Sequence, residues 1–284
     1  MNIRRVLVPL EGSERDRPAL SAALAVATAF DAHVDAMYVR LQPSDTLPFV
    51  GEGMSAALVQ EMIELTERES AQHAVAAEAT FEELRQAVGV PQRSEPGQPG
   101  PSADWFEEDA LVEDAIVTAG RLADLIVLAR PAASGGGSGN ATFGITLFET
   151  GRPVLVAGTH GPLTIAGKVV VAWDGSAQAT RALTAALPFL ARAARVTLVT
   201  ARESGSGEGE LADVAAYLAW HGISAERRAV MHHPSVAEAL VAAAIGADLL
   251  VMGGYSHSRL RELILGGVTR HMLEKAAVPL LLAH

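Results

Sequence analysis

Apolar residues along the chain form short continuous runs that alternate with longer segments of helical spacing. In the second half the runs predict strands, and the Ala- and Leu-rich segments between them predict helices. The predicted strands are Val169–Trp173, Val196–Thr200, Ala225–Met231, Leu249–Met252 and Pro279–Ala283, and the predicted helices are Ala177–Ala191, Gly209–Trp220, Ser235–Ala244 and Thr269–Lys275. Uninterrupted apolar strands are typical of a parallel sheet that helices cover on both faces. The pattern therefore predicts an α/β fold with right-handed crossovers.

The same pattern occurs twice. The segment "RRVLVPLEGSERDRPAL" near the start matches "GKVVVAWDGSAQATRAL" in the middle, because each has an apolar strand, an acidic residue with Gly-Ser, and a helix that opens on Ala-Leu. "ADLIVLARP" and "ADLLVMGG" form a second pair, and "RPVLVAGTH" and "AVPLLLAH" form a third, in the same order. Three ordered matches indicate a duplication. We expect two similar domains, at residues 1–159 and 167–284, each with a five-stranded parallel sheet.

The first half is longer than the second. The acidic residues of the first two matching motifs are 113 positions apart in the first half and 74 apart in the second. The surplus follows the second predicted strand and includes "ALVQEMIELTERESAQHAVAAEATFEELRQAVG", in which apolar residues recur at helical spacing. We expect a long surface helix from Ala57 to Val88, followed by a mobile Pro- and Gly-rich loop at residues 92–103.

Composition narrows the class of protein. Hydrophobic residues make up 49% of the 284 positions and charged residues 19%, which is typical of a compact globular chain. The net charge of −11 argues against nonspecific binding to nucleic acid or to an anionic membrane. The chain has no cysteine, which excludes disulfides, thiolate metal sites and cysteine nucleophiles. Because the start lacks a signal-peptide pattern and no apolar run is long enough for a membrane helix, we expect a cytoplasmic protein.

Asp174 stands where a ligand would bind in such a fold. Open parallel sheets bind ligands at the carboxyl ends of their strands, where the strand order reverses. Asp174 directly follows the strand Val169–Trp173, so its carboxylate is a candidate acceptor for a ribose hydroxyl or a base amine. An Asx turn or a helix cap, in which the carboxylate binds only local amides, accounts for the residue equally well. Both interpretations stay open.

A second candidate is the segment "GGYSHSRLRELILGG", which starts at Gly253 and ends at Gly267. Glycines allow a close approach of the backbone, and the free amides of a helix start attract anions. The predicted helix at Thr269 follows the last glycine pair, and "SHSR" between the pairs adds further donors. The alternative is a loop in which the glycines only supply positive φ angles.

The segments "VVVAWDGS", "ADLLVMGGYSHSRLRELILGGVTRHML" and "AVPLLLAH" together resemble the universal stress protein family. The resemblance covers both halves and implies a tandem protein, in which each domain has the strand order 3-2-1-4-5 and the domains pair through their last strands. Many members of that family bind ATP at the ends of strands one and four. The resemblance thus implies a stress-response binding protein without catalytic residues, with ATP or another adenine nucleotide as ligand and no metal. The resemblance leaves open whether the protein binds an unknown protein partner and whether it forms a homodimer.

The family motif is a glycine, two residues, a glycine, nine residues, and a glycine followed by Ser or Thr. Gly253 and Gly266 match its first and third glycines, whereas Ser256 replaces the second glycine and Gly267 replaces the hydroxyl residue, for which Thr269 is a candidate substitute. The resemblance therefore implies a partial site in the second half, with the aspartate near the base or ribose, Val199–Ala201 beside the base, and helix-start amides facing phosphate. Its candidate residues are Asp174, Val199, Gly253, Ser256, Gly266, Gly267, Val268 and Thr269.

The first half departs further from the motif. Its acidic residue is Glu11 rather than aspartate, and Asn140 occupies the place of the third motif glycine. The run "SGGGSG" lacks the Gly-Lys-Ser/Thr of a phosphate-binding loop, so a flexible loop is the better interpretation. If a nucleotide binds, we expect it in the second half.

The remaining candidates suggest no catalytic site. His232 and His233 are adjacent without acidic partners at useful spacing, which favours a loop over a metal site. Trp220 is expected on the apolar face of its helix. Two alternatives to nucleotide binding remain: a scaffold that binds only proteins, and an adenylating enzyme of a related fold. Against the enzyme, neither half carries the expected Ser-Gly-Gly-x-Asp-Ser loop after its first strand.

Overall fold

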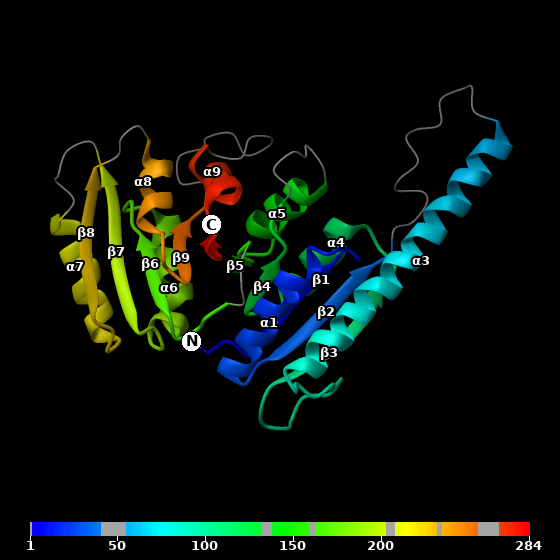
Figure 1. The fold of residues 1–284 in the computed structure, drawn as a ribbon, viewed down its shortest axis with the longest axis horizontal. Helices are drawn as coiled ribbons and strands as arrows, with labels where there is room; N and C mark the ends of the chain where they lie inside the picture. The colour runs from blue at the N-terminus through cyan, green and yellow to red at the C-terminus, as the bar shows by residue number, and fades with distance from the viewer. Residues whose placement is uncertain are drawn as a thin grey trace.

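A computed structural model of the chain describes residues 2–40, 55–131, 138–159, 163–202, 208–231, 235–254 and 267–284. Strands and helices alternate through both halves (Figure 1). The first half contains β1 (Arg5–Leu10), α1 (Asp16–Phe30), β2 (His33–Val39), α3 (Ala56–Ala87), β3 (Ser102–Glu108), α4 (Val112–Gly120), β4 (Leu125–Leu128), α5 (Ser138–Glu149) and β5 (Val154–Val156). The second half contains β6 (Lys168–Ala172), α6 (Ala177–Leu190), β7 (Arg195–Arg202), α7 (Glu208–Trp220), β8 (Ala225–Met231), α8 (Val236–Ala243), β9 (Leu249–Gly253), α9 (Gly267–Lys275) and β10 (Leu280–Ala283).

The described strands form one sheet in the order β3-β2-β1-β4-β5-β10-β9-β6-β7-β8. Within each half the strands are parallel and follow the expected order 3-2-1-4-5. The halves meet where β5 pairs antiparallel with β10, with Leu155 opposite Leu281. Pairing through the last strands is therefore confirmed, but it produces one continuous 10-stranded sheet rather than two separate sheets. Each edge satisfies the unpaired backbone groups of the other.

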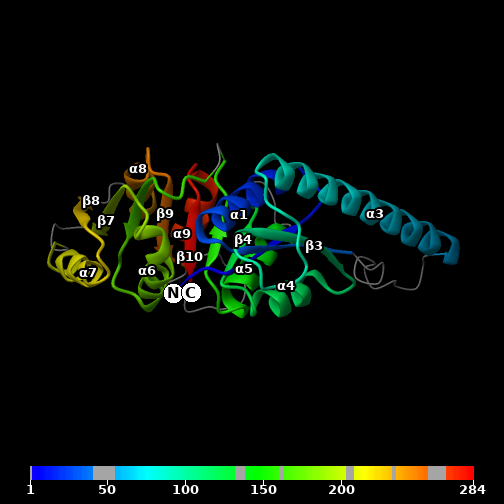
Figure 2. The same cartoon turned by 90° about the horizontal axis from the view of Figure 1, so that it is seen from below.

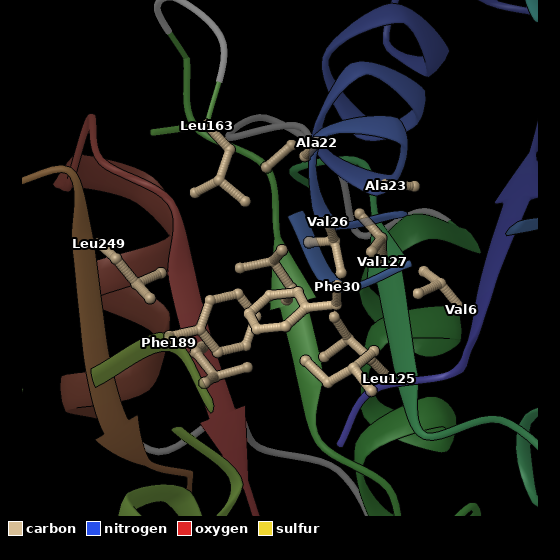
Figure 3. Packing of buried hydrophobic residues seen from close by; sticks show 14 of the residues in the cluster. Val6, Ala22, Ala23, Val26, Phe30, Leu125, Val127, Leu163, Phe189 and Leu249 are labelled. Carbon is tan, nitrogen blue, oxygen red and sulfur yellow. The ribbon is translucent and has the colours of Figure 1, made fainter. Parts of the chain in front are cut away.

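Helices cover both faces of this sheet (Figure 2). On one face α1, α3, α6 and α7 contribute to a buried apolar cluster, and on the other α4, α5, α8 and α9 do so. Phe30 of α1 meets Phe189 of α6 edge to face across the junction, with ring centroids 5.2 Å apart (Figure 3). Leu163, from the segment that links the halves, is buried in the same cluster. The two halves thus share one core.

The elements of the second half lie within two residues of their predicted bounds. β7 continues to Arg202, and α9 begins at Gly267. Ser235 caps α8 as its spacing to Glu238 suggests, because its side-chain oxygen accepts the Glu238 N–H at 3.2 Å. Continuous apolar runs located β6, β9 and β10, which are almost entirely buried. β8 is the exception, because this edge strand is mostly exposed and carries charged residues.

The long surface helix is confirmed as α3, which has 32 residues, whereas its counterpart α7 has 13. Ala74, Ala77 and Phe81 form a buried stripe that packs on the first half of the sheet. The amino-terminal part of α3 extends beyond the edge of the sheet (Figure 1).

One prediction near this region holds in part, and one in α7 was wrong. Residues 93–101 form neither helix nor strand, as expected of a loop, but its last two expected residues belong to β3. Ala103 exchanges backbone hydrogen bonds of 3.0 Å with Pro91 and Arg93. β3 forms by pairing with β2. The Pro- and Gly-rich residues before it made the sequence look like a continuous loop. Trp220 is 90% exposed because the buried stripe of α7 runs through Leu218 instead.

Candidate functional site

The candidate site lies at the carboxyl edge of the second half of the sheet. β6 is flanked by β7 on one side and β9 on the other, so the chain crosses over in opposite directions from it. This is the switch point at which open α/β sheets bind ligands. Asp174 follows β6, and Gly253 ends the neighbouring β9. The structure thus brings these two predicted residues to the same edge.

The loop between β6 and α6 is a tight turn. Gly175 has a left-handed φ of 79°, a conformation that glycine adopts without steric cost. The Ser176 side-chain oxygen caps α6 by accepting the Ala179 N–H at 3.0 Å. The exposed Asp174 accepts the Ser176 N–H through Oδ1 at 3.0 Å. The Asx turn is therefore present, and it holds the exposed carboxylate just beyond the carboxyl end of β6.

Gly253 is required by packing. A Cβ at this position would lie 2.6 Å from the backbone nitrogen of Ala179, in the first turn of α6. A side chain at position 253 would push β9 away from α6, the helix that follows Asp174 and Ser176. The alternative expected from the sequence, a glycine that only supplies a positive φ, is wrong for Gly253, because its φ is not positive. Close packing against α6 accounts for this glycine without any ligand.

The amino end of α9 is the part of the segment that suits an anion. Gly267, Val268 and Thr269 form its first turn, where backbone N–H groups lack acceptors within the helix. Thr269 is 3% exposed and Val268 is packed against the apolar cluster, so these residues offer main-chain rather than side-chain donors. Ser256 and Gly266 lie outside the described residues.

Val199 lies in β7 beside the end of β6. It is level with Ala172, the last residue of β6, and its backbone oxygen accepts the Trp173 N–H at 2.8 Å. The side chain is fully buried in the apolar cluster. Because β7 continues to Arg202, Val199 belongs to the body of the sheet, and the half-buried Ala201 stands nearer its edge.

In the equivalent loop of the first half, the backbone amides are bound by a side chain from the same segment. Gly12 repeats the left-handed φ of its counterpart, at 76°. The buried Asp16 carboxylate accepts the N–H groups of Glu11, Gly12 and Ser13, at 3.0, 2.7 and 3.1 Å. Burial raises the pKa of Asp16, and the three amide hydrogen bonds oppose that rise. Glu11, at the place of Asp174, pairs with Arg15 at 2.8 Å instead.

The helix α3 covers this first-half loop. A Cβ on Gly12 would lie 2.3 Å from the backbone oxygen of His73. One turn earlier, Ser70 accepts the Tyr38 hydroxyl through its backbone oxygen at 2.9 Å, directly at the end of β2. The sequence interpretation missed both features. The spacing of Ser13 and Asp16 matches a capping-box signal, whereas the path of α3 has no local signal.

Among the described residues, no group of three or more His, Asp or Glu side chains is placed to hold a metal ion. His232 and His233 are outside that set. Of the helices in the described ranges, none has both the length and the apolar character needed to cross a membrane.

Comparisons with known proteins place the fold. Residues 200–284 match the model of the universal stress protein family. No curated protein matches the chain. A universal stress protein from Archaeoglobus fulgidus is 20% identical with a TM-score of 0.63, and the match covers 98% of this chain and 97% of that one.

Two further structures are similar. A putative universal stress protein from Pseudomonas aeruginosa is 18% identical with a TM-score of 0.55, over 98% of this chain and 92% of that one. A universal stress protein in complex with cAMP is 17% identical over 56% of this chain and 100% of that one, but its TM-score of 0.39 assigns no ligand here. The family match, the repeated strand order and the full-length similarity agree with one another: residues 200–284 match the universal stress protein family, and the chain has the fold of solved universal stress proteins, with the same strand order in each half.

Proposed function

We propose that this protein binds an adenine nucleotide, with ATP as the first candidate, in the second-half crevice and acts by binding rather than by catalysis. The observation that carries the proposal is the convergence at one switch point of the exposed Asp174 carboxylate and the end of β9, with the chain then leading to the start of α9. That arrangement offers an acceptor for a nucleoside and main-chain donors for phosphate.

The proposed roles follow from position. Asp174 would accept a hydrogen bond from the ribose or the base. The N–H groups of Gly267, Val268 and Thr269, together with Gly266, would face phosphate, aided by the partial positive charge of the helix start. Ser256 and Gly253 would border the phosphate path, and Val199 with the residues after it would support the base.

We also propose a division into domains of unequal function. Residues 1–159 would form a domain whose nucleotide site is degenerate, and residues 167–284 a domain with a partial site. The support is the contrast between the two loops. In the first loop Asp16 accepts three backbone amides and the exposed Glu11 pairs with Arg15, whereas in the second loop the exposed Asp174 accepts the Ser176 N–H.

Calorimetric titration with ATP tests the proposal. Loss of one hydrogen bond to a charged group, as expected from the incomplete motif, costs about 1.5–3 kcal/mol, so the titration must extend to millimolar ATP. We expect Asp174→Ala to weaken binding and Glu11→Ala, its match in the first half, to leave it unchanged. Equal effects of the two substitutions would place the site elsewhere, and an absence of binding would favour a protein scaffold.

A further inference from the structure

Arg130 joins the two halves through four backbone carbonyls. It stands two residues after β4, and its Nη1 donates to the oxygens of Leu273 at 2.8 Å and Met272 at 3.3 Å. Its Nη2 donates to the Val278 oxygen at 2.8 Å, and its Nε to the Ala157 oxygen at 3.2 Å. Three of the four acceptors belong to the second half.

The acceptors on α9 lie at its carboxyl end. Met272 and Leu273 belong to the last turn of this nine-residue helix, where the helical hydrogen-bond pattern ends. The Met272 oxygen also accepts the Ala276 N–H at 3.0 Å, so Arg130 adds a second donor there. A cation at the carboxyl end of a helix is also favoured by the helix dipole. Burial lowers the pKa of Arg130 to about 10, so the guanidinium stays charged at neutral pH.

The contact occurs on one side of the duplication only. In the matching motifs Arg130 stands where the second half has Gly254. A Cβ on Gly254 would lie 2.8 Å from the Leu147 side chain of α5, which is the first-half counterpart of Leu273. Equivalent surfaces therefore meet on both sides of the junction. Arg130 binds the carboxyl end of α9 on one side, and Gly254 packs against α5 on the other.

We propose that Arg130 is a positioning residue of the second-half site, through which the first half fixes α9 and thereby sets the affinity for nucleotide. The proposal rests on the proposed function, because it takes the amino end of α9 as the phosphate-binding element. A helix of nine residues is too short to be stable alone, so its orientation depends on tertiary contacts. Arg130 supplies such contacts at the end opposite to the proposed phosphate.

The experiment compares Arg130→Met and Arg130→Lys with Arg121→Met in the full chain. Arg121 is the matched control, because its Nε donates to the Glu149 oxygen at the end of α5, at 3.2 Å, and it makes this contact within the first half. Two quantities are measured for each variant: hydrogen exchange of the α9 amides without nucleotide, and the dissociation constant for ATP.

We expect Arg130→Met to accelerate exchange in α9 about tenfold and to weaken ATP binding about tenfold, as the loss of charged hydrogen bonds predicts. Exchange in α1 should change much less, which separates local positioning from a loss of global stability. Arg130→Lys keeps the charge and one donor direction, so it should restore part of both effects. Arg121→Met should change neither quantity.

Three results would overturn the proposal. Unchanged exchange in α9 of Arg130→Met would show that the contacts do not hold the helix. Faster exchange with unchanged ATP affinity would show that the helix end does not set affinity. If Arg130→Met does not fold, Arg130→Lys replaces it. Unchanged exchange in α9 together with an unchanged dissociation constant for ATP in Arg130→Lys would then contradict the proposal. If the parent protein binds no ATP, the proposed function fails, and with it the link to affinity, whereas exchange still decides whether Arg130 holds α9.

Discussion

At the scale of single residues, hydrogen bonds within each β–α loop determine which of its amides and carboxylates are available to a ligand. In the first loop three amides converge on the buried Asp16, whereas in the second Asp174 accepts the Ser176 N–H and is exposed. The sequence indicated an aspartate at the second loop and left open the Asx turn that the structure contains, since such a turn depends on neighbours in the chain. The spacing of Ser13 and Asp16 gave a local signal for the first loop, but the burial of Asp16 depends on the fold around it.

A polar cluster at the opposite edge of the sheet links the amino ends of three strands. Arg5 Nε donates to Asp35 Oδ2 at 2.6 Å, His33 Nε2 lies 3.5 Å from Asp35 Oδ1, and His33 Nδ1 lies 2.8 Å from Ser102 Oγ. Burial disfavours the Asp35 anion, but the hydrogen bonds from His33 and Arg5 outweigh burial and hold the pKa of Asp35 below its usual value of 3.8.

The lowered pKa predicts an acid-dependent contribution to stability. Because the folded pKa lies below the unfolded one, the contribution is complete above about pH 4 and is lost as the pH falls through the folded pKa. We expect Asp35→Asn to lower the free energy of unfolding by about 1–2 kcal/mol at pH 7, a modest value because Arg5 is half exposed. Urea denaturation from pH 7 to pH 3 measures this difference, which should shrink toward acid.

The control for this prediction is Asp104→Asn, whose parent carboxylate accepts from the neutral Gln92 amide at 3.3 Å. It should change stability by less than about 0.5 kcal/mol. A difference between Asp35→Asn and the parent that stays constant down to pH 3 would contradict the assigned pKa shift.

At the scale of elements, the apolar pattern predicted the buried strands β6, β9 and β10 and the 32-residue α3 well, because burial imposes the pattern. The edge strand β8 is mostly exposed and had a weaker pattern. The pattern could not predict contacts between elements. In the sequence Gly253 and Gly12 are both glycines near the end of a strand. In the structure Gly253 allows the close approach of the first turn of α6, whereas Gly12 allows the close approach of α3. β3 was also missed, because its pairing with β2 depends on a strand more than 60 residues earlier.

We expect Gly253→Ala to destabilise the protein by about 1–3 kcal/mol, because its Cβ would overlap the backbone at Ala179 and force β9 away from α6. Gly144→Ala is the matched control. It lies inside α5 with no atom within 4 Å of the added Cβ, so it should stabilise the helix by about 0.5–1 kcal/mol. Chemical denaturation measures both. Equal effects of the two substitutions would refute a close approach at Gly253.

At the scale of the whole molecule, the duplicated halves behave as one body. The continuous sheet through β5 and β10 gives each half the edge partner that the other needs. The aromatic contact of Phe30 with Phe189 joins the helices above that junction, and Arg192 lies 4.2 Å from the centre of the Phe30 ring. The duplication and the pairing of last strands were predictable, whereas the shared core depends on packing that the repeat does not encode.

The shared core predicts cooperative unfolding. Phe189→Ala removes a fully buried ring at the junction and should cost about 3–5 kcal/mol, with one transition for the whole chain. Leu65→Ala, at a side chain that is 51% exposed on α3, should change stability by less than about 0.5 kcal/mol. Thermal unfolding followed by circular dichroism measures both. Two separated transitions in the parent protein would show that the halves unfold independently.

We propose that the second half of this tandem protein holds a nucleotide site and that the site of the first half is occupied by its own residues. The number of ATP molecules bound per chain at saturation, measured by equilibrium dialysis or calorimetry, distinguishes the two halves. We expect one ATP per chain, bound by the second half. Two per chain would contradict the closure of the first half by Asp16 and α3, and none at millimolar ATP would contradict the site itself.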